Sequence, residues 1–185
     1  MLPIIIRTLS SHNSPHRRAP SLQSLQASLR ALHRPAPCIH ATLAAMEQVP
    51  PEGFSPWTLG SSVTAPWDPI YVETLGHCVH LGTFLRPAMC NSKGSVHGGV
   101  ITTLCEFSMG RSCANLARKE HPDIRHLVTT HLAVDFVGSA ESGWIEVRFR
   151  VVQAGAKTGM ADAIVFAEDR VIARATASFR AIRDR

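Results

Sequence analysis

The sequence predicts an α+β domain in which one antiparallel sheet of about five to six strands wraps around one long central helix. Two observations predict this fold class. Residues 97–118 are mostly apolar or small, which is typical of a helix that is buried on most sides. After a polar connection, four segments with apolar residues at alternating positions follow in close succession, separated by short turns. Such strands have one covered face, and a sheet packed on one helix satisfies that requirement.

The predicted helix follows a loop of turn-forming residues. Residues 91–94 (Asn-Ser-Lys-Gly) have turn chemistry, and His97 then precedes two glycines. Between residues 100 and 110 the only charge is Glu106, and a charge in such a run is costly unless it is paired or used. The glycines allow close approach to the backbone, and free N–H groups at a helix start favour a developing negative charge. A donor-rich helix start and a carboxylate about two turns along it are the parts of an acyl-transfer site.

The other elements follow in chain order. Residues 69–75 are predicted to form a short helix, with Asp68 as N-cap, Pro69 at its first position and Gly76 at its end. A first strand is expected within residues 78–86. The four later strands are expected at residues 126–137, 144–153, 160–167 and 171–182. The outer face and the edges of such a sheet need partners, so an oligomer is expected.

The first of the four later strands has a clear alternation. One face carries Leu132, Val134 and Phe136, and the other carries His131, Ala133 and Asp135. Period-two alternation of this kind predicts that the apolar set packs against the helix.

Residues 1–46 have a different composition from the rest of the chain. They are rich in Ser, Arg, Pro and His and contain no Asp or Glu, and residues 21–33 can form a basic amphipathic helix typical of a transit peptide. A disordered tail and an over-extended start codon are the alternatives. We therefore predict a leader over residues 1–46 and a folded domain over residues 47–185. The expected location is the cytoplasm, or the mitochondrial matrix if the leader is a transit peptide.

Composition and charge exclude several classes of function. The net charge is +5, five arginines lie in the leader, and the remainder is close to neutral, so nucleic-acid binding is not indicated. No apolar run is long enough to span a membrane. The five cysteines form no Cys-x-x-Cys pair, which favours reduced thiols. The ten histidines are scattered without ligand-like spacing, so no metal site is predicted.

The order of elements resembles the hotdog fold, and residues 65–182 resemble its PaaI-like acyl-CoA thioesterases. The similarity rests on the pattern NxxGxxHGG at residues 91–99, followed by Glu106 and Gly110. Further support comes from VTT at residues 128–130, VDF at 134–136 and IARATASF at 172–179. His-Gly-Gly alone is a weak signal. An Asn six residues before the His and a carboxylate nine residues after it make the match more specific.

The resemblance implies two central catalytic groups. Glu106 matches the family's acidic residue, which is a general base for water or a nucleophile that attacks the thioester. Gly98 matches the glycine whose backbone N–H polarises the thioester carbonyl. In this family the site spans two subunits, so Glu106 would meet Asn91 and Gly98 of a partner. The structural alternative for Glu106 is a buried carboxylate paired with Arg111 or with a histidine of a partner.

The resemblance implies supporting roles for five further residues. Asn91 matches a polar position that orients water or the acyl group, and His97 is expected to order the loop. Thr129 falls where some relatives place a hydroxyl near the carboxylate. Gly99 and Thr130 are expected to contact substrate. The structural alternatives are a turn residue for Asn91, a local hydrogen bond for His97, a helix-start turn for the glycines, and an ordinary β-branched strand residue for Thr129.

The predicted function is hydrolysis of an acyl-CoA thioester to a free acid and coenzyme A. It needs no metal or cofactor, and the expected assembly is a homodimer or homotetramer with its active site at the subunit interface. A hotdog hydratase or dehydratase and a non-catalytic acyl-CoA-binding module are the alternatives. Arg86, Lys93 and Lys157 are candidates to meet the phosphates of coenzyme A, and the sequence does not select among them. Acyl chain length also stays open.

Overall fold

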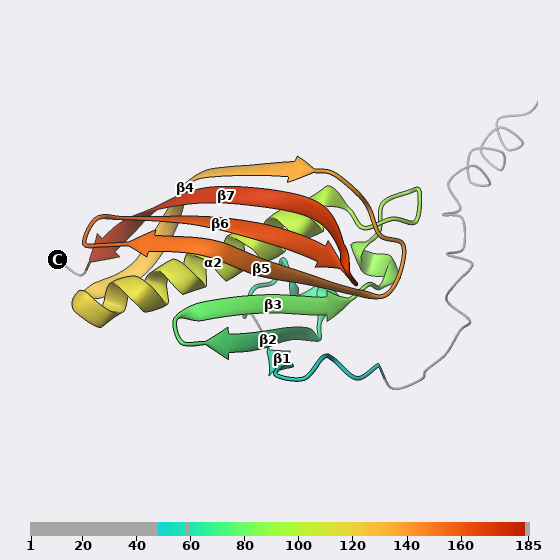
Figure 1. Ribbon diagram of the computed structural model, residues 1–185, viewed down its shortest axis with the longest axis horizontal. Helices are drawn as coiled ribbons and strands as arrows, with labels where there is room; N and C mark the ends of the chain where they lie inside the picture. Colours follow the sequence, from blue (N-terminus) through green and yellow to red (C-terminus); the bar gives the residue numbers. More distant parts are fainter. Residues whose placement is uncertain (1–47, 58–59, 184–185) are drawn as a thin grey trace, which may run out of the picture. The chain divides into compact units, whose positions relative to one another are not determined.

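The computed structural model describes residues 48–57 and 60–183, apart from the side chains of residues 150–152. The predicted leader therefore lies outside the described residues. A seven-stranded antiparallel sheet, in the order β1-β2-β3-β5-β6-β7-β4, packs one face against a single long helix, α2 (Figure 1). Among the described residues, no helix is long and apolar enough to cross a membrane.

The elements have the following bounds. The strands are β1 (Ser55–Trp57), β2 (Ile70–Leu75), β3 (Cys78–Phe84), β4 (Ile124–Phe136), β5 (Trp144–Ala154), β6 (Thr158–Ala167) and β7 (Arg170–Arg183). The helices among the described residues are α2 (Gly98–Glu120) and two short 3-10 segments, η1 (Ala65–Trp67) and η2 (Pro87–Met89). The long helix, the strand before it and the four strands after it confirm the predicted hotdog arrangement. The sheet has seven strands instead of the expected five to six.

The prediction of a short helix at residues 69–75 was wrong, because these residues form strand β2. The start signal of Asp68 and Pro69 is local, whereas the pairing of β2 with β3 over five residue pairs is a tertiary interaction. Ile70, Tyr71 and Val72 are also β-branched or aromatic, so they suit a half-buried pleated surface better than a helix. The pairing overrides the local capping signal.

The core lies between α2 and the inner face of the sheet. Apolar helix side chains are almost fully buried there, namely Val100, Ile101, Leu104, Cys105, Met109 and Cys113. Strands β5, β6 and β7 supply Ile145, Val147, Val165, Ile172 and Phe179 from the opposite side. Because the packed sheet surrounds the helix on several sides, α2 is held in one position relative to β4, which carries part of the site.

Two buried serines of α2 fasten the helix to β3. The Ser108 hydroxyl donates to the Val79 carbonyl at 2.5 Å, and the Val79 N–H donates to Ser112 Oγ at 2.9 Å. Ser112 Oγ in turn donates to the Ser108 carbonyl at 2.8 Å. These bonds satisfy backbone groups of Val79, which lies beyond the Leu81–Phe84 segment where β3 pairs with β5.

Strand β4 is the sheet edge next to β7 and contains a β-bulge at Thr130. Thr129 pairs with Phe179 and His131 pairs with Ser178, which leaves Thr130 as the extra residue. The bulge shifts the alternation, so that Leu127 and Thr129 face α2 before it and Leu132 and Val134 face α2 after it. A regular alternation throughout residues 126–137 would place Thr129 on the outer face.

Candidate active site

The loop before α2 is folded by Asn91. Its side-chain oxygen accepts the Lys93 N–H at 2.8 Å, and its amide nitrogen donates to Ser95 Oγ at 3.0 Å. The Asn91 N–H also donates to the Ser95 carbonyl at 2.8 Å. Within its own protomer the Asn91 side chain therefore holds the turn closed, which is the structural role weighed for it from the sequence.

His97 caps the start of α2. Its backbone is extended (φ −72°, ψ 134°), and its Nδ1 accepts the Gly99 N–H at 2.9 Å. Its own N–H donates to the Met89 carbonyl at 2.8 Å, which ties the helix start to η2. Because Nδ1 accepts a hydrogen bond, a neutral His97 carries its proton on Nε2. This local hydrogen bond is the structural alternative weighed for His97 from the sequence.

The Gly98 N–H differs from the Gly99 N–H in its hydrogen bonding. No acceptor among the described residues bonds it, whereas the Gly99 N–H is taken by His97. A free N–H at the first helical position, with the helix dipole behind it, is a donor for a developing oxyanion. A Cβ added to Gly98 would lie 3.1 Å from the Phe136 ring, so this donor sits beside the end of β4.

Glu106 lies about two turns further along α2 and faces β4. The Thr129 hydroxyl donates to Glu106 Oε1 at 2.6 Å, and among the described residues no donor bonds Oε2. The Glu106 side chain is half-buried. Arg111, the partner considered for Glu106 from the sequence, instead stacks over the Trp57 ring, with its guanidinium carbon 5.2 Å from the ring centroid. A carboxylate with one oriented oxygen and one open oxygen is suited to accept a proton from water.

The two halves of the expected site are well separated within one protomer. Glu106 follows Gly98 by eight positions in the helix, which corresponds to about 12 Å along the axis. A general base and an oxyanion donor both have to come within about 3 Å of one reacting carbonyl or its water. Glu106 and Gly98 of the same chain cannot serve the same carbonyl.

The structure offers no competing nucleophile among the buried thiols. Burial raises the pKa of both Cys105 and Cys113 to about 12. A thiol in such surroundings stays protonated at neutral pH and is inert. Neither cysteine is therefore a candidate for covalent catalysis, and Glu106 is the acidic group on α2 that faces the sheet edge.

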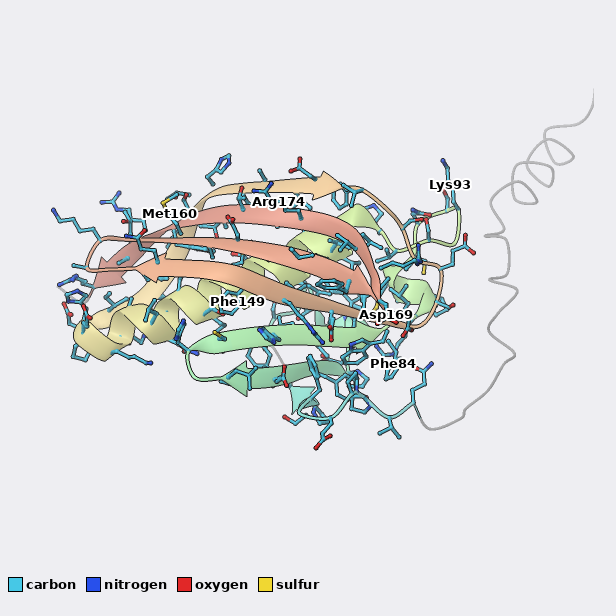
Figure 2. The ribbon with its side chains drawn as sticks, viewed as in Figure 1. Phe84, Lys93, Phe149, Met160, Asp169 and Arg174 are labelled. Carbon is cyan, nitrogen blue, oxygen red and sulfur yellow. The ribbon has the colours of Figure 1, made fainter. Side chains whose placement is uncertain are left out.

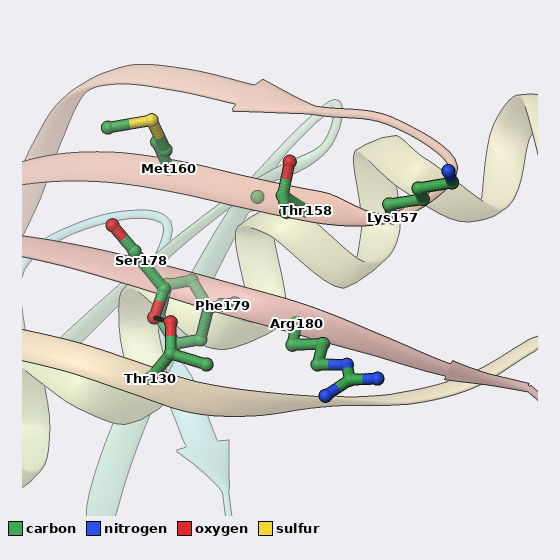
Figure 3. Close-up of a pocket in the computed structure, with 8 residues that line it drawn as sticks. Thr130, Lys157, Thr158, Met160, Ser178, Phe179 and Arg180 are labelled. Atoms are coloured by element: carbon green, nitrogen blue, oxygen red, sulfur yellow. Dashed lines mark hydrogen bonds between the residues drawn. The ribbon is translucent and has the colours of Figure 1, made fainter.

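A pocket of about 350 Å³ lies on the outer face of the sheet, over β6, β7 and β4 (Figure 3). Thr130 belongs to its lining and donates to the Ser178 carbonyl at 3.0 Å, so Thr130 faces this pocket while Thr129 faces Glu106. The other lining residues are Lys157, Thr158, Gly159, Met160, Ser178, Phe179 and Arg180. Sequence reasoning named Lys157 and Thr130 but missed Thr158, Ser178 and Arg180, because only the strand register brings them together.

The three basic residues considered from the sequence for coenzyme A phosphates lie in different surroundings. Arg86 has a structural role, since its Nη1 donates to the Trp67 carbonyl and to Thr83 Oγ1, both at 3.0 Å. Lys93 projects from the loop before α2 (Figure 2). Lys157 lines the outer pocket. Phe136 is a further residue beside the site, and sequence analysis predicted for it only a position on the apolar face of a strand.

Comparison with known proteins shows what this chain is similar to. A model of the thioesterase superfamily matches residues 93–173. A protein from Pseudomonas aeruginosa whose name describes it as an inferred esterase is 29% identical over 131 residues, covering 70% of this chain and 95% of that protein.

Solved structures agree on the fold. A thioesterase family protein from Silicibacter pomeroyi superposes with a TM-score of 0.60 at 24% identity, covering 67% of this chain and 91% of the other. A hypothetical thioesterase from Streptococcus pneumoniae, whose structure contains coenzyme A, superposes with a TM-score of 0.55 at 20% identity, covering 64% and 93%. The chain is similar to the thioesterase superfamily over residues 93–173 and has the hotdog fold.

Proposed function

We propose that the protein hydrolyses an acyl-CoA thioester to a free carboxylic acid and coenzyme A. The observation that carries this proposal is the Glu106–Thr129 pair, in which the Thr129 hydroxyl holds one carboxylate oxygen at 2.6 Å and leaves the other open. The Gly98 N–H, which no acceptor among the described residues bonds, supplies the second requirement, a donor for the oxyanion, from a second copy of the chain. A relative of the same fold, from Streptococcus pneumoniae, was solved with coenzyme A, which supports this substrate class.

In the proposed reaction, Glu106 acts as general base and takes a proton from water as the water oxygen attacks the thioester carbonyl. The carbonyl oxygen becomes an oxyanion that accepts a hydrogen bond from the Gly98 N–H. The tetrahedral intermediate then collapses, the C–S bond breaks, and the coenzyme A sulfur leaves and receives a proton. If Glu106 is instead the nucleophile, its carboxylate attacks the carbonyl, the C–S bond breaks, and coenzyme A leaves as the thiolate, which takes up a proton. Water then hydrolyses the resulting anhydride to the free acid and restores the Glu106 carboxylate.

The proposed site is shared by two protomers. Because Glu106 and Gly98 lie about 12 Å apart along one helix, the oxyanion donor has to come from a second copy. Strand β4 is an edge with large exposed apolar side chains, including Val128 (46% exposed) and Phe136 (52% exposed). If β4 strands of two copies pair antiparallel with Phe136 opposite Thr129, Gly98 of the partner subunit comes to Glu106, since Gly98 lies beside Phe136.

The test is thiol release from a panel of short, long and aromatic acyl-CoA substrates, measured for the wild type and for Glu106→Gln. The glutamine keeps the size of the side chain and can still accept the Thr129 hydroxyl, but it cannot take a proton from water. We expect turnover by the wild type and a fall in kcat of at least about a hundredfold in the variant. The panel also gives the acyl class, and thermal unfolding of both proteins verifies that the variant is folded.

The same panel separates the alternatives. A hydratase would change the absorbance of an enoyl-CoA without releasing thiol, and a binding module would retain acyl-CoA without either signal. Absence of thiol release from every substrate, with the protein folded and oligomeric, contradicts the proposed hydrolysis.

A further inference from the structure

The outer-face pocket is assembled by the register of three strands. Thr158 pairs with Arg180 and Met160 pairs with Ser178 across β6 and β7, and the bulge residue Thr130 of β4 adjoins Ser178. Lys157 precedes β6, and its carbonyl accepts the Ala181 N–H at 2.9 Å, which fixes it next to Arg180. The side chains of Lys157, Thr158 and Arg180 gather at one end of the pocket, and Met160 lies at the other (Figure 3).

The charge of this pocket is positive and uncompensated. No carboxylate lines it, and no acidic side chain among the described residues pairs with Lys157 or Arg180. Arg183 nearby is paired with Asp123 at 2.7 Å, so it is neutralised. Two cations, together with the hydroxyls of Thr158 and Ser178, are the donor set that binds phosphate groups.

The pocket lies directly behind the proposed catalytic site. Thr129 and Thr130 are consecutive on β4, and the first bonds Glu106 on the helix side while the second lines the pocket on the outer side. Val128 pairs with Arg180, so the pocket lies close to the sheet edge. In the proposed β4 pairing the partner's strand ends opposite Thr129, which leaves the edge from Ile124 to Val128 uncovered. A substrate that occupies both the outer pocket and the site at Glu106 would have to pass around this edge.

We propose that Lys157 and Arg180, with the neighbouring Thr158 hydroxyl, bind the phosphate groups of the coenzyme A part of the substrate in this outer pocket. The exposed Met160 side chain at the other end offers an apolar contact for the adenine or the arm. This inference rests on the proposed thioesterase function and adds the part of the site that distinguishes a coenzyme A thioester from a simple thioester.

The experiment compares two substrates with the same acyl group, an acyl-CoA and the acyl thioester of N-acetylcysteamine, which carries no phosphate. The double variant Lys157→Gln/Arg180→Gln should raise KM for the acyl-CoA by about tenfold per cation removed and leave kcat unchanged. It should leave kcat/KM for the phosphate-free thioester unchanged. Direct binding of adenosine 3′,5′-bisphosphate should weaken by a similar factor.

The matched control is Arg174→Gln. Arg174 is exposed on the same strand, its position in β7 places it on the same sheet face as Arg180, and it lies outside the pocket. It should change none of these quantities. An unchanged KM for acyl-CoA in the double variant overturns the inference while thiol release still supports the hydrolase. Equal effects of Arg174→Gln and Arg180→Gln overturn it as well, because they would indicate only a diffuse charge effect.

The two proposals can fail separately. If no thioester is hydrolysed, binding of adenosine 3′,5′-bisphosphate that is lost in the double variant still supports the pocket and leaves the protein as a binder of coenzyme A. If thioesters are hydrolysed but the bisphosphate does not bind the wild type, the pocket assignment is overturned and the proposed hydrolysis stands.

Discussion

Helix α2 carries polar side chains toward two different strands, and the two groups have opposite character. Toward β3, Ser108 and Ser112 are fully buried and bonded to Val79 or to each other. Toward β4, Glu106 is half-buried, and among the described residues its only hydrogen bond is the one from Thr129. The serines complete backbone pairing inside the protomer, whereas the carboxylate keeps an open oxygen at a sheet edge.

This difference shows how a structural polar group can be told from a functional one in the same helix. Buried polar groups in a stable fold are almost always satisfied, because an unmet donor or acceptor costs about 1–3 kcal/mol. A charged group left partly unsatisfied beside an exposed edge is therefore a candidate for chemistry or for a partner contact. The variants below test that division, from the largest expected effect to the smallest.

The largest effect is expected from removing the Gly98 N–H. Gly98→Pro lacks this donor, and proline is tolerated at the first helical position after an extended residue such as His97. We expect kcat for acyl-CoA hydrolysis to fall by about a hundred- to a thousandfold. The control is Gly98→Ala, which retains the N–H and introduces the same Cβ beside Phe136. Equal losses in both variants would mean that crowding, and not the donor, matters.

Removal of a structural hydroxyl should lower stability and leave the rate of hydrolysis unchanged. Ser112→Ala leaves the buried Val79 N–H without its acceptor, so the free energy of unfolding should fall by about 1–3 kcal/mol in urea titrations. The kcat of the folded protein should be unchanged. Thr103→Ala is the control, because Thr103 is only partly buried and its hydroxyl bonds the Gly99 carbonyl at the open end of the helix. A loss of activity in folded Ser112→Ala would contradict the assignment of Ser112 to a purely structural role.

Thr129 is a positioning residue in this account, since it acts through Glu106. Thr129→Val keeps the shape and removes the hydroxyl, and we expect kcat to fall about tenfold with little change in KM. Thr129→Ser should restore most of the rate. Failure of serine to rescue would assign Thr129 to packing alone.

The smallest effect is expected at the helix cap. His97→Ala removes the acceptor for the Gly99 N–H and should lower the free energy of unfolding by about 1 kcal/mol. His97→Asn provides another capping oxygen and should recover that loss. If neither stability nor kcat changes in His97→Ala, the cap contributes nothing measurable.

Much of the fold could be predicted from local patterns. The apolar run of α2 and the alternation in β5 and β7 each follow from burial of one face, and the strand order matched the family pattern. The β2 strand could not be predicted, because its start looks like a helix cap and its conformation is decided by pairing with β3. A local capping pattern does not decide the conformation of a segment that can pair with a neighbouring strand.

The site was predictable only in part for a similar reason. Glu106 and Gly98 could be proposed as site residues because their spacing along one helix is visible in the sequence. The β-bulge at Thr130, which turns Thr129 toward Glu106, depends on strand register and leaves no sequence signal. The cluster of Thr158, Ser178 and Arg180 likewise comes from cross-strand pairs whose members are far apart in the chain. Asn91 proved to fold its own turn, a role the sequence had left as an alternative.

We propose that Glu106 of one protomer acts with Gly98 of the other, and mixing two inactive variants tests this shared site most directly. Glu106→Gln and Gly98→Pro are co-refolded or co-expressed, and thiol release is compared with each variant alone. A mixed dimer contains one site with both groups intact, so random pairing should restore about a quarter of wild-type activity. Recovery to that level agrees with the shared site. Exchange of subunits without any recovery would contradict it.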